Sequence, residues 1–286
     1  MRKKIIFVCI SFILIENISF AQPGIDTTSS EEIDYIKLSA VGGITAGVFI
    51  WGYEVQNNLW WKGDKSKFHF EWKHDLAYAL GEDKFGHFFF PYLIVNIYSQ
   101  LFNWTGIDYD KSLLYAGALA LSYETFVEIR DGYSKQWGFS WGDFSADVLG
   151  AAYPVLQNKI PILQNFNFKI SFYPSDRFQE GSNRVIFDDY ESTYDWLSVN
   201  VHNILPDKLK NYYPEFINLA IGHSVEKLDN NGGGNHRFYI AIDWNLEELP
   251  GNGWFWNLLK RNFNYYHLPS PAVQIYPHVI WYGIKF

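Results

Sequence analysis

The spacing of hydrophobic residues changes near residue 165 of this chain. Before that point apolar positions recur at helical intervals, and the pattern predicts four helices, over residues 38–53, 84–104, 110–131 and 140–157. After it, apolar and polar residues alternate, which predicts strands over residues 166–173, 194–201, 216–225, 237–246 and 280–286. The sequence therefore predicts an α+β fold, in which a four-helix bundle-like region precedes an antiparallel β-sheet or partial barrel.

A few residues mark the ends and bends of these elements. Ser140 is a predicted helix N-cap, with Asp143 at the third helical position. Two prolines are expected to bend or end the helices that carry them, Pro91 and Pro154. The Gly43-x3-Gly47 motif would let another backbone approach the first helix closely. Three further segments are predicted: a hairpin loop over residues 230–235, a short helix over 254–261 and an extended connector over 267–271.

The first residues have the layout of a cleavable secretory signal. A basic start precedes an apolar run over residues 5–15, and Ser19 and Ala21 are the small residues of a cleavage site. This predicts a signal peptide over residues 1–21, a helical domain over 22–165 and a β region over 166–286. Cleavage would remove Cys9, the only cysteine, and would thereby exclude disulfides, thiolate metal ligands and cysteine nucleophiles from the mature protein.

The predicted helices are too short or too polar to cross a membrane. The uncharged run Leu38–Tyr53 has 16 residues, whereas a spanning helix needs about 20. The last strand resembles the C-terminal assembly signal of bacterial outer-membrane β-proteins, because apolar positions alternate up to the terminal Phe286. A complete outer-membrane barrel usually has at least about eight strands, so a periplasmic sheet packed on the helices is the alternative.

Composition favours an envelope protein over a nucleic-acid-binding one. The formal net charge is −8, and aromatic residues make up 20% of the chain. The acidic charge excludes nucleic acid as a partner. Enrichment in Trp and Tyr is expected at a membrane–water boundary, and it is equally compatible with an aromatic soluble core. We predict a membrane or envelope lipid as the partner.

Polar residues at helical spacing stand inside three of the apolar helices. They form one set on each helix: Asp83 and His87 on the second; Glu124, Glu128 and Asp131 on the third; Asp143 and Asp147, with Gly150, on the fourth. An imidazole and several carboxylates inside a helical bundle are the ligand set of helical metal sites. Such a set suits a hard or borderline divalent cation. Gly150, which has no side chain, would let its helix pack closely.

The sequence leaves the chemistry of this cluster open. A divalent metal ion is the candidate cofactor, with ligands from His87, Glu124, Glu128, Asp131 and Asp147. Acid–base chemistry is also open where neighbours raise the pKa of one carboxyl group, and its candidate catalytic residues are Asp83, His87, Glu124 and Asp143. Two interpretations that involve neither a ligand nor a reaction also remain: a buried structural network, or a solvated face with Lys84 and Arg130 as counter-ions.

The ordered motifs resemble two known families. Asp83-Lys84-x2-His87, then Glu124, then Ser140-x2-Asp143-x3-Asp147-x2-Gly150 is similar to the YfiM-type family of predicted envelope lipoproteins, a domain of unknown function. More distantly, it resembles the VanZ-like family of small helical membrane proteins. The resemblance covers roughly residues 33–157 and implies an envelope role and a shared helical core, without a reaction. The chain departs from these families in lacking a lipobox cysteine and in having more polar helices.

Two functional hypotheses follow. In the first, the chain is an exported envelope protein on the periplasmic side of, or within, the outer membrane of a Gram-negative bacterium, with a structural or binding role. In the alternative, the helical cluster is a metal-dependent or acid–base enzyme that acts on an envelope lipid or glycan. A serine–histidine hydrolase is disfavoured, because the sequence has no Gly-x-Ser-x-Gly motif.

Overall fold

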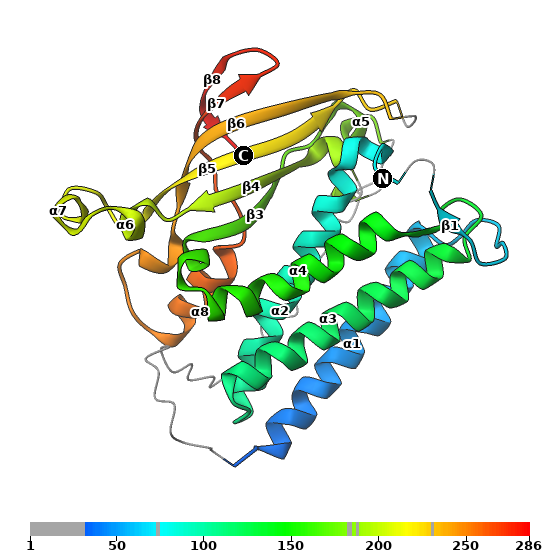
Figure 1. Ribbon diagram of the computed structural model, residues 1–286, viewed down its shortest axis with the longest axis horizontal. Helices are drawn as coiled ribbons and strands as arrows, with labels where there is room; N and C mark the ends of the chain where they lie inside the picture. Colours follow the sequence, from blue (N-terminus) through cyan, green and yellow to red (C-terminus); the bar gives the residue numbers. More distant parts are fainter. Residues whose placement is uncertain (1–31, 73–74, 182–184, 187–188, 230–231) are drawn as a thin grey trace.

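The computed structural model describes residues 32–286 except 73–74, 182–184, 187–188 and 230–231. A helical region is followed by an antiparallel sheet that packs against one end of it, which confirms the predicted α+β fold (Figure 1). The predicted signal segment 1–21, with Cys9, lies outside the described residues, and so does the tip of the predicted loop at Asn230 and Asn231.

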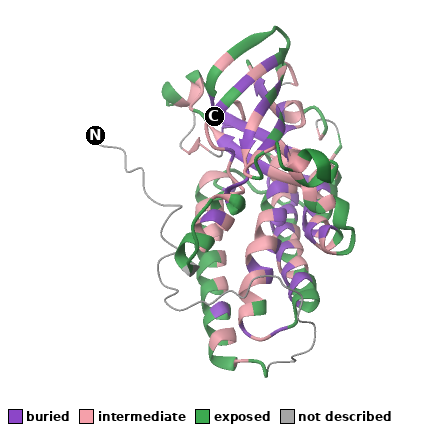
Figure 2. Cartoon of the chain, turned by 90° about the vertical axis from the view of Figure 1, so that its left-hand side faces the viewer, coloured by how far each residue is buried: buried purple, intermediate pink, exposed green. Residues whose placement is uncertain are grey.

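Four long helices in the described chain match the four predicted ones: α1 Tyr35–Leu59, α2 Glu82–Trp104, α3 Tyr109–Gly132 and α4 Trp141–Lys159. Helices α2, α3 and α4 pack against one another, and α1 lies along their outside (Figure 1). Small and branched side chains fill the joint core: Val41, Val95, Leu113, Ala116, Ala120 and Ala151. Small residues let the helix backbones approach closely, and the buried positions therefore line the faces where helices meet (Figure 2).

Helix α1 differs most from its prediction. It has 25 residues, because Lys37 and Glu54 extend the helix beyond the uncharged run, and in length and composition it is the one described helix that could span a membrane. The expectation that the first helix is too short to span a membrane is therefore wrong in its length. No described atom lies within 4 Å of where a Cβ would stand on Gly43 or Gly47, so the expected close approach of another backbone does not occur there.

The structure confirms the predicted N-cap of α4 but not an end of this helix at its proline. The Ser140 hydroxyl accepts a hydrogen bond from the Asp143 N–H at 2.9 Å, which confirms the predicted N-cap of α4. Helix α4 nevertheless continues through Pro154 to Lys159, so Pro154 does not end it. Pro154 is buried, and the packing of α4 on its neighbours outweighs the one helical hydrogen bond that proline removes.

The sheet is a six-stranded antiparallel meander in the order β3-β4-β5-β6-β7-β8 among the described residues. Its strands are β3 Phe166–Phe172, β4 Thr193–Val199, β5 Ile217–Glu226, β6 Asn235–Trp244, β7 Ser270–Tyr276 and β8 Ile280–Lys285. Strand β7 begins inside the segment 267–271, which was expected to be an extended connector. A short parallel pair, β1 Phe70–Glu71 and β2 Phe139–Ser140, ties the segment before α2 to the start of α4.

Short helical segments link these elements. They are η1 Tyr78–Gly81, η2 Pro161–Asn165, α5 Asp176–Gln179, η4 Tyr190–Ser192, α6 Val201–Ile204, α7 Asp207–Lys210, η5 Leu246–Glu248 and α8 Trp254–Phe263. The last of them is the predicted short helix 254–261, two residues longer than expected.

The two faces of the sheet have opposite polarity. The inner face buries charged and polar groups, and at its centre the Lys169 ammonium lies 2.7 Å from one Asp243 oxygen while His267 Nδ1 lies 2.8 Å from the other. The outer face is apolar, with Ile221, Ile240 and Trp281 exposed by 55%, 48% and 80%. A half-solvated sheet normally hides its apolar face, so this sheet is inverted relative to the usual pattern.

Ser270 continues the inner polar network. It lies 3.3 Å from His267 Nε2, so Ser270, His267 and Asp243 have the order of a catalytic triad. The three residues are at most 1% exposed, and the Ser270 hydroxyl donates to the Ile242 carbonyl rather than to the imidazole. A nucleophile must reach its substrate, so we assign these groups to the structure of the sheet.

Candidate functional site

The start of α2 is positioned by an unusual turn. Ala79, Leu80 and Gly81 have positive φ angles of 47°, 58° and 81°, a left-handed conformation that non-glycine residues rarely adopt. Directly after the turn, α2 begins with Glu82 and Asp83, both nearly fully buried at 2% and 6% exposure. Glu82 lies against the sheet, whereas Asp83 lies beside α4, so the first two residues of α2 belong to two different clusters.

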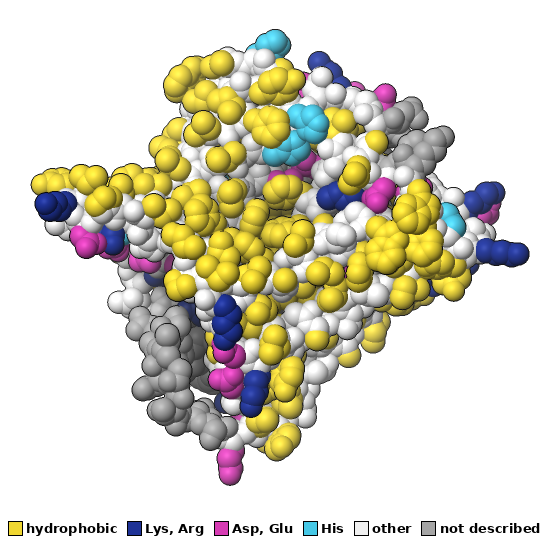
Figure 3. Space-filling view, viewed as in Figure 1, with side chains coloured by type: hydrophobic (Ala, Val, Ile, Leu, Met, Phe, Trp, Pro, Cys, Tyr) yellow, Lys and Arg dark blue, Asp and Glu magenta, His cyan; other side chains and the backbone are white. Residues whose placement is uncertain are grey.

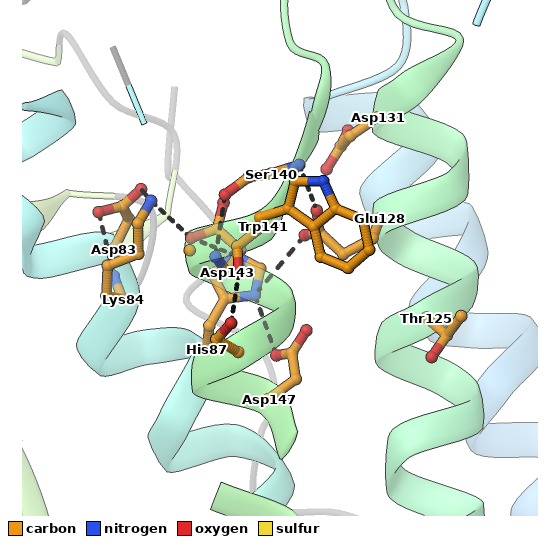
Figure 4. Close-up of polar contacts among 12 residues, drawn as sticks. Asp83, Lys84, His87, Thr125, Glu128, Asp131, Ser140, Trp141, Asp143 and Asp147 are labelled. Carbon is orange, nitrogen blue, oxygen red and sulfur yellow. Dashed lines mark hydrogen bonds and ion pairs between the residues drawn. The ribbon is translucent and has the colours of Figure 1, made fainter. Parts of the chain in front are cut away.

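The first cluster is centred on His87 in the middle of the helical region. His87 Nδ1 lies 3.1 Å from an Asp147 oxygen and 3.8 Å from Glu128 Oε1, and its Nε2 lies 3.8 Å from Asp143 Oδ1. These side chains come from α2, α3 and α4 and point toward one another (Figure 4). Ligand atoms of His87, Glu128 and Asp147 all lie within 4.8 Å of one another, a separation that one metal ion can bridge.

One carboxylate oxygen of Asp147 has no hydrogen-bond partner among the described residues. The residue is 0% exposed, and its Oδ1 contacts His87. No described group donates a hydrogen bond to its other oxygen, Oδ2. A buried carboxylate oxygen without a donor is costly unless a proton or a cation lies beside it.

Lys84 forms the second part of the same cluster. Its ammonium lies 2.7 Å from Asp143, 2.9 Å from Asp83 and 2.9 Å from Asp75. Asp75 also accepts hydrogen bonds from the Ser140 hydroxyl at 2.6 Å and the Gly142 N–H at 3.0 Å. A side chain on Gly142 would collide with this arrangement, because its Cβ would stand 2.6 Å from Asp75 Oδ1. Lys84 therefore neutralises one edge of the cluster and holds the start of α4.

The whole cluster is strongly acidic. Seven carboxyl groups surround the cations Lys84 and His87: Asp75, Asp83, Glu124, Glu128, Asp131, Asp143 and Asp147. Burial raises the pKa of Glu128 to about 8, and burial together with the charge of Asp147 raises the pKa of Glu124 to about 8. Burial also acts to lower the pKa of His87, but Asp147, Asp143 and Glu128 outweigh it and raise that pKa well above its ordinary value. Negative charge in this site is therefore poorly compensated by the residues of the described chain.

The structure brings together three of the five predicted metal ligands. His87, Glu128 and Asp147 meet, whereas Asp131 accepts a hydrogen bond from the Trp61 indole at 2.7 Å and stands beside the group. Glu124 is buried one turn before Glu128 but is not part of the group. Among the candidate catalytic residues, Asp83 and Asp143 are linked through Lys84, and Asp143 also faces His87.

The solvated-face interpretation is wrong. Glu128 and Asp147 are at most 1% exposed, so the acidic stripe faces the interior of the helical region. Lys84 is a counter-ion as expected. Arg130 instead lies over the rings of Trp61 and Tyr53, at 4.7 Å and 5.6 Å from their centroids.

Sequence reasoning missed four residues of these clusters. Asp75 lies in a turn with no periodic signal, although its position shortly before α2 places it near Lys84. Glu82 precedes the predicted start of the second helix at residue 84, and Asp195 and His223 are single polar positions in the strands β4 and β5. The structure places Glu82, Asp195 and His223 together, with ligand atoms within 4.8 Å of one another.

A family model described as "Predicted periplasmic lipoprotein (DUF2279)" matches residues 71–159. The matched segment includes every residue of the His87 cluster and stops before the sheet. It fits an uncharacterised protein of the cell envelope, and it does not extend to Asp195 or His223. No curated protein and no solved structure matches the chain.

Proposed function

We propose that this chain is an exported envelope protein that binds one divalent cation between α2, α3 and α4, with His87, Glu128 and Asp147 as ligands. One observation carries the proposal: these three residues converge within 4.8 Å, and the fully buried Asp147 keeps one oxygen free of any described donor. One nitrogen and two carboxylate oxygens suit a borderline cation such as Zn²⁺ or Mn²⁺. Asp143, 3.8 Å from His87 Nε2, would orient the imidazole from outside.

Asp147→Asn is expected to weaken Zn²⁺ binding by at least about 100-fold. The change removes a charged ligand and keeps the shape of the side chain. Mutating even a residue that only hydrogen-bonds a metal ligand lowers metal affinity by about 10–100-fold. Isothermal titration of the purified chain with Zn²⁺ measures the effect. Asp207→Asn is the matched control, because Asp207 is 96% exposed and lies on the short helix α7. Equal affinity in the two variants would remove Asp147 from any metal site.

We also propose that the outer face of the sheet contacts membrane lipid. Cross-strand neighbours form one apolar row over β4 to β8, namely Leu197, Ile221, Ile240, Val273 and Trp281. Figure 3 shows apolar side chains spread over this side of the molecule. Acyl chains are the occupant that the polarity favours, because this row is apolar and exposed while Lys169, Asp243 and His267 are buried on the opposite face of the sheet.

Replacing Ile240 and Trp281 together by serine is expected to reduce vesicle binding at least about tenfold. Burying one such side chain contributes about 1.5–3 kcal/mol, and about 1.4 kcal/mol is a factor of ten. Flotation with phosphatidylethanolamine and phosphatidylglycerol vesicles measures the bound fraction. Tyr212→Ser is the control, since Tyr212 is 85% exposed and follows α7, away from β8 (Figure 1). A double variant that floats like the control would contradict lipid contact through this row.

The second candidate function is catalytic. The same site that binds the cation lies in a protein with an apolar lipid-facing surface, which favours an envelope lipid over a glycan as substrate. In this hypothesis His87, Glu128 and Asp147 would hold a cation that supplies Lewis-acid chemistry toward an ester or phosphate group of the lipid. Water would add to that group, the bond to the leaving alcohol would break, and Glu124, whose pKa burial raises to about 8, would donate the proton that the leaving oxygen takes up. Glu124→Gln would then abolish hydrolysis of a lipid substrate while Zn²⁺ affinity stays unchanged.

A further inference from the structure

A second cluster of acidic and histidine side chains lies where the start of α2 meets the sheet. It joins Glu82 of α2, Asp195 of β4 and His223 of β5, and their ligand atoms all lie within 4.8 Å of one another. Asp195 and His223 are direct neighbours in the register of the two strands. The cluster therefore joins three elements from both parts of the fold, and none of its residues takes part in the His87 site.

The carboxylates of this cluster are buried and poorly compensated. Glu82 and Asp195 are each 2% exposed, and neither Asp195 oxygen accepts a hydrogen bond from a described donor. Glu82 Oε2 contacts His223 Nδ1 at 2.9 Å, and its other oxygen has no described donor. Two buried carboxyl groups side by side repel each other unless a proton or a cation lies between them.

His223 is held in a defined orientation. Its second nitrogen, Nε2, lies 2.9 Å from His236 Nδ1 on the adjacent strand β6. A hydrogen bond to the remote nitrogen is how metal-binding imidazoles are fixed in proteins. The side chain of His223 is 19% exposed, and Figure 3 shows histidine side chains reaching the surface beside acidic ones over the sheet. An ion from solvent therefore has a short route to the cluster.

We infer that Glu82, Asp195 and His223 form a second divalent-cation site, separate from the His87 site, which ties the helical region to the sheet. One imidazole nitrogen from β5 and carboxylate oxygens from α2 and β4 favour Zn²⁺ or Co²⁺ over Mg²⁺ or Ca²⁺. His236 orients His223 and is not a ligand itself.

The directions in which the pKa values of Asp195 and His223 shift agree with a cation site at these residues. Burial, followed by the charge of Glu82, raises the pKa of Asp195 well above its ordinary value, while burial lowers the pKa of His223. A neutral imidazole is the form that binds metal, so the site is already prepared on its nitrogen side.

Zn²⁺ stoichiometry separates this site from the first one. We expect the purified full chain to bind two Zn²⁺ ions, and Asp195→Asn and Asp147→Asn to bind one each. His223→Gln, a change at a partly exposed residue, should also leave one ion. His278→Gln is its matched control, because His278 is exposed and stands outside both clusters. Bound zinc is counted by elemental analysis after dialysis, and Co²⁺ substitution adds an absorption band that His223→Gln should lose.

The zinc counts of the variants test the two sites separately. One ion that is lost in Asp195→Asn and kept in Asp147→Asn would support the second site and overturn the first. One ion that is lost in Asp147→Asn and kept in Asp195→Asn would overturn the second site, and Glu82 and Asp195 would then be a carboxyl pair that shares a proton. Wild-type stoichiometry in both Asp195→Asn and His223→Gln would overturn the second site as well.

Discussion

Asp243→Ala is expected to lower the free energy of unfolding by about 3–5 kcal/mol, the range for removing one partner of a buried ion pair. Asp243 is 0% exposed, Lys169 is 1% exposed, and their charged atoms are 2.7 Å apart. Asp243 also accepts a hydrogen bond from the Ser198 hydroxyl at 2.6 Å. Alanine would leave the Lys169 ammonium inside the sheet without its carboxylate.

The pKa shifts of Lys169 and Asp243 show how burial and their mutual attraction oppose each other. Burial lowers the pKa of Lys169, and the nearby Asp243 acts in the opposite direction. For Asp243, burial acts to raise the pKa, but Lys169 and then His267 outweigh it and the net shift is downward. Removing Asp243 therefore removes the group that keeps Lys169 charged, and the variant must either lose that proton or admit water into the sheet.

Urea denaturation followed by tryptophan fluorescence measures this effect. Trp196 is fully buried and stacks on His267, with ring centroids 3.9 Å apart, so it is the one of the chain's 12 tryptophans whose emission we expect to follow the network most directly. The control is Asp207→Ala, a change at an exposed carboxylate that should stay within about 0.5 kcal/mol of wild type. The double variant Lys169→Met with Asp243→Leu removes both charges and should recover most of the loss. Equal midpoints for Asp243→Ala and its control would show that the buried pair adds no stability.

The long helices and most strands could be predicted because each repeats its pattern over many residues. Helix α3, for example, differs from its predicted span by one residue at each end. Strand β7 was missed, since Pro269 and Pro271 read as a connector, and only pairing with β6 and β8 makes the segment a strand. Alternation also does not say which face of a strand is buried. Ile221 and Ile240, for example, lie on the exposed outer face.

The sequence could predict those parts of the candidate site whose residues lie on the same helix. Asp83 and His87 follow one helix face, and so do Asp143 and Asp147, so helical spacing alone places each pair. The cluster of Glu82, Asp195 and His223 could not be found in this way. Its members belong to three elements far apart in the chain, and their convergence depends on how the sheet docks on α2.

Gly150→Ala is expected to destabilise the protein by about 3 kcal/mol and to weaken the His87 site at the same time. A Cβ on Gly150 would stand 2.1 Å from the Phe88 carbonyl oxygen and 3.0 Å from Pro91 Cγ, so α4 would have to move away from α2. Neither contact is with the end of a flexible side chain. Phe88 follows His87, and Gly150 lies about one turn after Asp147, so the same movement separates the two ligands that now lie 3.1 Å apart.

Gly86→Ala is the control that isolates this contact, because Gly86 also lies inside a helix but has no described atom within 4 Å of its Cβ position. Alanine there should stabilise α2 by about 0.5–1 kcal/mol through helix propensity and leave Zn²⁺ affinity unchanged. Urea denaturation and Zn²⁺ titration of both variants test the pair of expectations. Loss of stability in Gly150→Ala with wild-type Zn²⁺ affinity would show that the spacing of α2 and α4 does not set the ligand geometry.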